Sequence, residues 1–449
     1  MGLFGTNGVR GVFGEDLTLE MIHDLVLAAA SYYDGGPILV GYDGRKTSPM
    51  ISDAVCSALN YAGLDCSTAG LVPTPALEFA TKRLGYRGGI MITASHNPPR
   101  YNGIKMVARD GVEISREAEQ VIEEAYRAGR YRRGDGWGTS TPESRVLDTY
   151  LDGVCQQVDV DAIRSQNYTV IMDLGNGAQA VAAPVLAARL GCTVHTINGD
   201  IDGEFPGRGS EPTPDNLGAL SDAVQEQEAD IGIAFDGDGD RSMLCDEQGR
   251  ILSGDRSALL LTSHLLKMHP CSKVVTCMNS GLSIEDVAAE FSSQVIRTKV
   301  GSVEASRRML LEDALVGFEE NGGFMFGPHN HVRDGCMTMA LALDMLSCTG
   351  ASISEGIAGL PPSHTAKTKI SCTREEAQLV IDTLQKEHPG ADTSDGIKVR
   401  LGGRKWVMAR PSGTEPILRV YAESDSQKSL EVLLSGYVER IKSILDHRL

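Results

Sequence analysis

The sequence predicts an α/β protein with four domains, the last of which is α+β. Short apolar segments that suit buried strands alternate with segments of helical periodicity, a pattern typical of βαβ units with largely parallel sheets. The chain has 449 residues, which is more than one ordinary hydrophobic core accommodates. After a Gly-Leu-Pro-Pro segment at 359–362 this pattern changes. We therefore expect domains at 1–150, 151–250, 251–362 and 363–449.

The first domain is expected to alternate helices and buried strands. Thr18 can cap a helix whose apolar stripe includes Leu19 and Ile22. The further elements expected are a strand at 37–40, a helix at 49–62, a strand at 89–93, a helix at 117–126 and a loop at 130–143.

The second and third domains continue the same alternation. The elements expected in the second are a strand at 168–172, a helix at 178–190, a strand at 192–197, a loop at 198–212, a helix at 215–228 and a strand at 231–235. Helices and strands alternate again from about 255 to 348 in the third.

The fourth domain has a different pattern. Gly402 and Gly403 can supply the positive φ angles of a tight hairpin turn. The strands expected are 367–371, 397–401, 405–409 and 417–422, and the helices expected are 374–386 and 427–445.

Composition and charge exclude several classes of protein. The 42 basic and 60 acidic residues give a net charge of −18, which disfavours general nucleic-acid binding. No apolar run approaches the ~20 residues that cross a bilayer, and no segment has the pattern of a secretory signal. The ten cysteines are scattered without a C-x-x-C pair. We expect a cytoplasmic protein with reduced thiols that binds neither nucleic acid nor membranes.

The strongest chemical motif is Asp-Gly-Asp-Gly-Asp-Arg at 236–241, directly after the apolar segment 231–235. Three carboxylates at alternate positions can converge on one hard cation, because glycine lets the backbone turn tightly. An EF-hand loop is the competing interpretation, but Arg241 stands where that loop needs glycine. An acidic surface turn would be self-repelling. Three carboxylates suit Mg²⁺, which keeps places for water or phosphate oxygens.

The second motif is Thr-Ala-Ser-His-Asn-Pro at 93–98, which also follows a buried strand. Chemistry gathers at the carboxyl ends of parallel strands, so Ser95 is well placed as a nucleophile beside His96. The motif lacks the flanking glycines of a hydrolase elbow. An ordinary capping serine is the alternative interpretation.

Three further segments carry polar side chains that suit binding. The segment 410–416 offers one arginine, two hydroxyls and a glycine amide, which together suit an oxyanion. The segment 319–323 offers carboxylates and an amide for sugar hydroxyls, and the glycine-dense segment 5–11 contains Arg10. Each can also be an ordinary turn. A G-x-G-x-x-A match at 175–180 raises a nicotinamide hypothesis but leaves the other motifs unexplained.

Taken together and in this order, these motifs resemble those of the α-D-phosphohexomutase family over essentially the whole chain. Residues 93–98 resemble its phosphoserine loop, 236–241 its magnesium loop, 319–323 its sugar-recognition loop and 410–416 its phosphate-binding loop. The resemblance implies three related mixed α/β domains and a C-terminal α+β domain around a central cleft.

The resemblance also implies a mechanism. Ser95 would be phosphorylated in the resting enzyme, and its phosphate would complete the magnesium site. The phosphoryl group would pass to a hexose monophosphate, giving a hexose 1,6-bisphosphate that turns over in the cleft and returns its other phosphate. Lys105 and His96 are the candidates for the base, and a lysine beside a cationic cluster can have a depressed pKa, which favours Lys105.

The family pattern assigns roles to individual residues. The implied catalytic residues are Ser95, His96, Lys105, Arg10 and Arg241. The implied metal ligands are Ser95, Asp236, Asp238 and Asp240. The residues implied in binding the sugar and its non-reacting phosphate are Glu319, Asn321, Lys299, Arg410, Ser412, Gly413 and Thr414.

The resemblance leaves the substrate open among hexose phosphates. The segments at 4–11 and 410–416 look most like those of phosphoglucosamine mutases, so glucosamine phosphate is the expected substrate. The Glu-Glu-Asn-Gly-Gly segment is similar to archaeal members assigned to glucose and mannose phosphates. Glu320 could pair with a 2-amino group. A magnesium-dependent sugar phosphatase and a non-catalytic sugar-phosphate binder are the hypotheses of other classes. The partners expected are small-molecule hexose phosphates, with the chain a monomer or homodimer.

Overall fold

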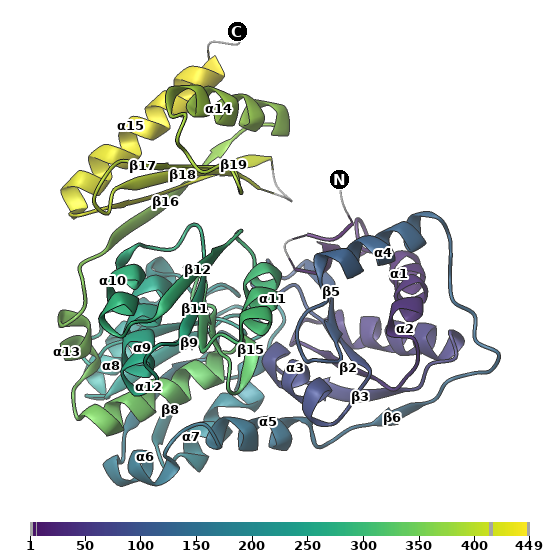
Figure 1. Ribbon diagram of the computed structural model, residues 1–449. Helices are drawn as coiled ribbons and strands as arrows, with labels where there is room; N and C mark the ends of the chain where they lie inside the picture. Colours follow the sequence, from purple (N-terminus) through teal and green to yellow (C-terminus); the bar gives the residue numbers. More distant parts are fainter. Residues whose placement is uncertain (1–2, 6, 413–415, 447–449) are drawn as a thin grey trace.

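Four sheets, each with its own helices, organise the protein in a computed structural model that describes residues 3–5, 7–412 and 416–446. In Figure 1 the first domain, coloured purple to blue, lies beside the green third domain, and the yellow C-terminal domain stands over the third. Polar contacts agree with this placement. Arg307 of the third domain pairs with Asp110 of the first at 2.6 Å, and Lys367 of the fourth pairs with Glu320 of the third at 3.1 Å.

The first domain contains a six-stranded sheet in the order β1-β5-β4-β2-β3-β6. Strand β5 is antiparallel to both of its neighbours, and the pairs among β2, β3, β4 and β6 are parallel. The Thr18 hydroxyl accepts the Met21 N–H, so the predicted helix cap is confirmed. The elements are β1 Val9–Val12, α1 Leu19–Tyr33, β2 Ile38–Tyr42, α2 Ser48–Tyr61, β3 Cys66–Leu71, α3 Thr74–Arg83, β4 Gly88–Ile92, β5 Tyr101–Ala108, α4 Arg116–Arg127 and β6 Ser140–Pro142.

The second domain contains a four-stranded sheet in the order β10-β9-β7-β8, in which only β10 runs antiparallel to its neighbour. Two helices, α5 and α6, connect it to the first domain. The elements are α5 Val146–Cys155, α6 Val160–Gln166, β7 Thr169–Asp173, η1 Ala178–Val181, α7 Ala183–Arg189, β8 Thr193–Ile197, η2 Pro214–Asn216, α8 Gly218–Glu226, β9 Ile231–Phe235 and β10 Ser242–Cys245.

The third domain contains a five-stranded mixed sheet in the order β12-β11-β13-β14-β15. Strands β12, β11 and β13 are parallel, and β14 and β15 continue the sheet in antiparallel fashion. The elements are α9 Gly254–Met268, β11 Lys273–Cys277, α10 Ser283–Glu290, β12 Gln294–Thr298, α11 Ser302–Glu312, β13 Val316–Phe318, β14 Phe324–Phe326, β15 Asn330–Arg333, α12 Gly335–Thr349 and α13 Ile353–Ala358.

The fourth domain is an antiparallel sheet in the order β16-β19-β18-β17, with both helices on the side away from the third domain (Figure 1). Gly402 and Gly403 have φ angles of 90° and 56°, and the strands on either side pair as predicted. The elements are β16 His364–Ser371, α14 Arg374–Glu387, β17 Ile397–Arg400, β18 Trp406–Pro411, β19 Ile417–Ser424 and α15 Gln427–Asp446.

The hydrophobic cores show which domains are tightly joined. One apolar cluster runs through the first three domains and includes Leu77, Tyr150, Phe235 and Phe318. The fourth domain has a separate core around Val420, and a small apolar cluster that includes Met278 and Trp406 joins it to the third domain. Domains that meet through a small interface move relative to one another more readily than domains that share a large core.

The structure differs from the sequence-based expectations in three ways. The expected helix at 178–190 is divided into η1 and α7, because Pro184 lacks the N–H of a helix interior and instead occupies the first turn of a new helix. The segment 130–143 was expected to be loop, but its end forms the edge strand β6. Strands β1, β3, β5 and β10 and helix α3 were not predicted. Within the described residues, no helix is long and apolar enough to cross a membrane.

Tyr150 should stabilise the junction between α5 and the third domain. Its buried hydroxyl donates to Asp334 Oδ1 at 2.6 Å, and Asp334 caps α12. We predict that Tyr150→Phe destabilises the protein by about 1–3 kcal/mol, since a buried carboxylate loses a hydrogen bond. Urea unfolding measures this. Tyr131→Phe is the matched control, because that hydroxyl bonds the surface residue Asp24, and an equal loss in the control would contradict the prediction.

Candidate active site

Ser95 lies in a loop directly after β4, and its side chain is buried. Its backbone is left-handed, with φ 52°, which costs a non-glycine residue about 1–3 kcal/mol unless neighbours hold it. The Thr93 hydroxyl accepts the Ser95 N–H at 2.8 Å, and Arg45 donates to the Ser95 carbonyl oxygen at 2.7 Å. The loop thereby holds the Ser95 hydroxyl 3.0 Å from Asp236 Oδ2.

Arg45 is a buried positioning residue that sequence reasoning missed. Its guanidinium pairs with Asp43 at 3.0 Å. It also donates to the backbone carbonyls of Ser95, Asn97, Pro98 and Tyr101. Burial raises the pKa of Asp43, whose carboxylate accepts hydrogen bonds from two hydroxyls besides Arg45. The sequence did contain one signal for this pair. Asp43, the partner of Arg45, directly follows a buried strand, and the Ser95 loop follows another.

The Asp-Gly-Asp-Gly-Asp segment turns directly after β9. Asp236 Oδ1 accepts the N–H groups of Gly239 and Arg241 at 3.0 and 3.1 Å. A Cβ at Gly237 would lie 2.7 Å from the Ser95 carbonyl oxygen, and Gly239 has φ 77°. The first glycine permits the close approach of the Ser95 loop and the second permits the turn, which confirms the tight turn predicted from the motif.

The three aspartates form one buried cluster, in which one carboxylate oxygen from each residue lies within 4.8 Å of the others. Burial, followed by the negative charges of Asp238 and Asp240, raises the pKa of Asp236 well above its usual range. Asp238 Oδ1 and Asp240 Oδ1 are buried without a hydrogen-bond partner among the described groups. Buried carboxylate oxygens that accept no hydrogen bond suit a hard divalent cation that is bound by only a few protein ligands. The cluster therefore fits Mg²⁺, with the Ser95 hydroxyl beside it.

Lys105 lies on β5 with its ammonium buried between two of these aspartates. Its Nζ is 2.6 Å from Asp238 Oδ2 and 2.9 Å from Asp240 Oδ2. Burial by itself lowers the pKa of Lys105, but the two carboxylates outweigh burial and the net pKa is raised. The depressed pKa expected from the sequence is therefore wrong, because the nearest charges to the amine are negative.

His96 is the imidazole beside the serine, with Nδ1 3.4 Å from Ser95 Oγ. Burial, followed by the charges of Arg241 and Arg10, lowers the pKa of His96 well below its usual value. The ring is therefore neutral at pH 7. Arg10 comes from β1 and donates to the Asn97 side chain at 2.9 Å, and burial lowers its pKa to about 10.

Two arginines extend the network of charges around Asp240. Arg241 Nε lies 3.9 Å from Asp240 Oδ1, and its guanidinium lies 3.6 Å from Glu211. Arg333, at the end of β15, contacts Asp240 at 2.5 Å and Glu319 at 3.1 Å. Arg333 thus links the aspartate cluster to the segment expected to recognise the sugar, and no motif in the sequence marked it.

The expected sugar segment lies between β13 and β14. Glu319 is buried, and Asn321 accepts the Gly323 N–H at 3.2 Å, which closes the turn. Glu320 pairs with Lys367 of the fourth domain at 3.1 Å. Glu320 therefore already has a cationic partner, which weakens the idea that it pairs with an amino sugar.

The expected phosphate-binding segment meets the third domain at the end of β12. Arg410 Nε contacts Asp395 at 2.9 Å, and its guanidinium donates to the Val300 carbonyl at 3.4 Å. Lys299 precedes Val300 and is exposed. The Ser412 N–H donates to the Ile417 carbonyl at 2.9 Å. The expected positions Gly413 and Thr414 lie outside the described residues.

The glycine-rich match at 175–180 has a packing explanation. A Cβ at Gly175 would lie 2.6 Å from the Arg208 guanidinium, and one at Gly177 would lie 2.8 Å from the Gly237 carbonyl. Arg208 also pairs with Asp173 at 2.7 Å. These glycines let the segment support the aspartate turn, which accounts for them without a dinucleotide.

Comparison with known proteins agrees with this architecture. Four family models, described as phosphoglucomutase/phosphomannomutase α/β/α domains I, II and III and the C-terminal domain, match residues 1–133, 148–249, 253–364 and 368–435. Together with the fold they define a phosphohexomutase, an enzyme that moves a phosphoryl group within hexose phosphates. The chain belongs to the phosphoglucomutase/phosphomannomutase family.

Relatives that match over nearly the whole chain have names that specify different sugars. A phosphoglucosamine/phosphogalactosamine mutase of Sulfurisphaera tokodaii is 39% identical, with 99% of each chain covered. A phosphoglucomutase/phosphomannomutase of Thermococcus kodakarensis is 34% identical, again with 99% of each covered. A crystal structure of a phosphoglucomutase/phosphomannomutase family protein of Burkholderia thailandensis is similar with a TM-score of 0.87 at 26% identity, covering 98% of this chain and 97% of that one.

Lys105 and a bound divalent cation should offset the negative charge of the same two carboxylates, those of Asp238 and Asp240. Breaking a buried ion pair costs about 3–5 kcal/mol, because a charge is left without a partner. We predict that Lys105→Met destabilises the protein by this amount without Mg²⁺, and that Mg²⁺ restores part of the loss. Urea unfolding with and without Mg²⁺ measures both effects.

Lys273→Met is the matched control for this prediction. Its partner Glu312 lies on the surface, so the expected loss is below about 1 kcal/mol and independent of Mg²⁺. An identical Mg²⁺ effect in Lys105→Met and the native chain would contradict the shared role.

Proposed function

We propose that this mutase interconverts the 6- and 1-phosphates of glucosamine through a phosphoserine at Ser95 and a hexose 1,6-bisphosphate intermediate. The observation that carries the proposal is the buried Ser95 hydroxyl, 3.0 Å from Asp236 in a cluster of three aspartates. The substrate choice is supported by the name of the relative that is 39% identical over the full chain.

The proposed resident metal is Mg²⁺. Asp236, Asp238 and Asp240 would hold it together with an oxygen at Ser95. When bound, it withdraws negative charge from a phosphoryl group during transfer. Asp238 Oδ1 and Asp240 Oδ1, which are buried and accept no hydrogen bond from the described residues, support this assignment.

The protein's own groups account for the movement of the phosphoryl group and the proton. The bond from phosphorus to Ser95 Oγ breaks as a bond to the sugar hydroxyl forms, so that hydroxyl loses a proton and Oγ gains one. His96 Nδ1 lies 3.4 Å from Ser95 Oγ, and this geometry suits proton exchange there. Arg10 and Arg241 would stabilise the negative charge of the transferring group. Lys105 would hold Asp238 and Asp240 in place.

The sugar and its second phosphate would be held by the other two domains. Glu319 and Asn321 would contact sugar hydroxyls. Lys299, Arg410 and Ser412, together with Gly413 and Thr414, would bind the phosphate that does not react. The pairing of Asp395 with Arg410 and of the Val300 N–H with Asp395 at 2.8 Å supports a joint role for these segments.

A general glucose and mannose phosphate mutase is the alternative within the same reaction class. The name of the Thermococcus kodakarensis relative favours it. A phosphorus NMR panel distinguishes the two: the protein receives Mg²⁺, a trace of hexose bisphosphate and one hexose phosphate at a time. We predict fastest exchange between the 1- and 6-phosphates for glucosamine. Faster exchange of glucose or mannose phosphate would support the alternative, and release of inorganic phosphate alone would indicate a phosphatase.

The nucleophile has its own test. We predict that Ser95→Ala lowers mutase turnover by more than about 10⁴-fold, as removal of a catalytic nucleophile does, with the fold retained by circular dichroism. Ser165→Ala, which changes an exposed serine of α6, should leave turnover unchanged. Substantial turnover in Ser95→Ala would mean that phosphate does not pass through Ser95.

A further inference from the structure

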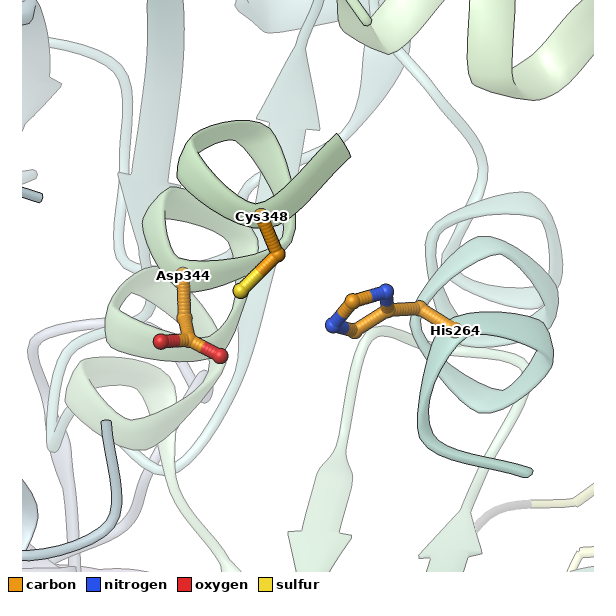
Figure 2. A group of neighbouring side chains, drawn as sticks. All are labelled: His264, Asp344 and Cys348. Atoms are coloured by element: carbon orange, nitrogen blue, oxygen red, sulfur yellow. The ribbon is translucent and has the colours of Figure 1, made fainter. Parts of the chain in front are cut away.

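A second group of metal-ligand side chains lies in the third domain. Asp344 and Cys348 are four residues apart on α12, and His264 points toward them from α9 (Figure 2). One ligand atom from each residue lies within 4.8 Å of the others. Residues spaced by four share one face of a helix, so the two α12 side chains face the same neighbour. Among the described residues, this is the only such group besides the three aspartates.

The polar atoms of this group have few other partners. His264 Nε2 is buried without a hydrogen-bond partner among the described residues. Asp344 is only 8% exposed, and its Oδ1 accepts the Asp159 N–H at 2.8 Å, which leaves its second oxygen available. No cation of the described part of the chain pairs with Asp344. A buried carboxylate and a buried imidazole nitrogen are both more stable with an electrophilic partner.

The donor types point to a particular class of metal. An imidazole nitrogen, a carboxylate oxygen and a thiolate sulfur match Zn²⁺ and similar borderline transition metals, whereas Mg²⁺ and Ca²⁺ take oxygen donors. Ligand atoms around a tetrahedral zinc ion lie about 3.5 Å apart, so the three side chains would need to close by at most about 1 Å. Cys348 is exposed and can rotate to do so.

We propose that His264, Asp344 and Cys348 form a binding site for Zn²⁺ or a related transition-metal ion, with water as the fourth ligand. The thiol of Cys348 gives up its proton to solvent as the metal–sulfur bond forms. The thiolate and the carboxylate together balance the charge of the ion.

The site would fix α9 against α12. The α9 residue Arg256 donates to the carbonyls of Ile357 and Pro361, in the segment that leads to the fourth domain. A metal bound here therefore stabilises the part of the third domain that anchors this segment. This proposal does not depend on which hexose phosphate the enzyme uses.

Cobalt titration tests the site directly. The full-length protein, in a thiol-free buffer with a phosphine reductant and a large excess of Mg²⁺, is titrated with Co²⁺. Thiolate coordination gives an intense sulfur-to-cobalt charge-transfer band in the near ultraviolet, which the all-oxygen aspartate cluster cannot give. We expect the band to saturate at one equivalent and to disappear when one equivalent of Zn²⁺ is added.

Variants assign the band to these residues. Cys348→Ser should abolish it, and His264→Gln and Asp344→Asn should weaken Co²⁺ binding by more than about 10-fold. Asp344→Asn keeps an oxygen that can accept the Asp159 N–H, so the fold is retained. Cys271→Ser is the matched control, because it removes another exposed cysteine. The absence of a band in the native chain, or a band that survives in Cys348→Ser, would overturn the proposal.

Thermal unfolding gives a second readout. One equivalent of Zn²⁺ should raise the unfolding temperature of the native chain and of Cys271→Ser but not that of Cys348→Ser. Mutase turnover without added Zn²⁺ should be the same in all three, since Cys348 has no place in the phosphoryl-transfer site. An equal rise in all three would place zinc elsewhere and contradict the assignment.

Discussion

Three carboxylates are buried within five residues of chain at the end of β9, and their mutual repulsion constrains the rest of the site. Two unit charges within 4.8 Å of each other repel by at least about 3 kcal/mol at an effective dielectric constant of 20. The surrounding structure offsets this repulsion with Lys105 from the first domain and Arg333 from the third. A bound cation would offset the remainder, and the same charge would lie beside the Ser95 hydroxyl.

The same constraint explains how the domains are joined. The aspartate turn belongs to the second domain, Ser95 and Lys105 to the first and Arg333 to the third, and one apolar core runs beneath all of them. These three domains therefore hold the transfer site rigidly. The fourth domain has its own core, and it meets the third through a small apolar cluster that includes Met278 and Trp406 and through polar pairs such as Arg410 with the Val300 carbonyl. This division would suit the proposed bisphosphate intermediate, which has to turn over between two phosphoryl transfers.

The sequence predicted those parts of the site that depend on local chain direction. Asp236 and Glu319 directly follow buried strands, Ser95 lies in the loop after another, and glycines marked the turn at Asp236. The sequence could not predict contacts between residues that are far apart along the chain. Strand β5 inserts antiparallel beside β4, and this pairing carries Lys105 to the aspartates and reverses its expected pKa shift. Arg333 was missed for the same reason, because a single arginine at a strand end carries no motif.

The central claim is that phosphate moves between Ser95 and a hexose phosphate without passing to water. A single-turnover chase tests it most directly. Protein labelled with radioactive phosphate at Ser95, located by peptide mapping, is mixed with unlabelled glucosamine 6-phosphate and Mg²⁺. The account predicts that the label leaves Ser95 and is recovered in sugar phosphates. Recovery of the label as inorganic phosphate, or its retention on the protein while the sugar exchanges, would contradict the account.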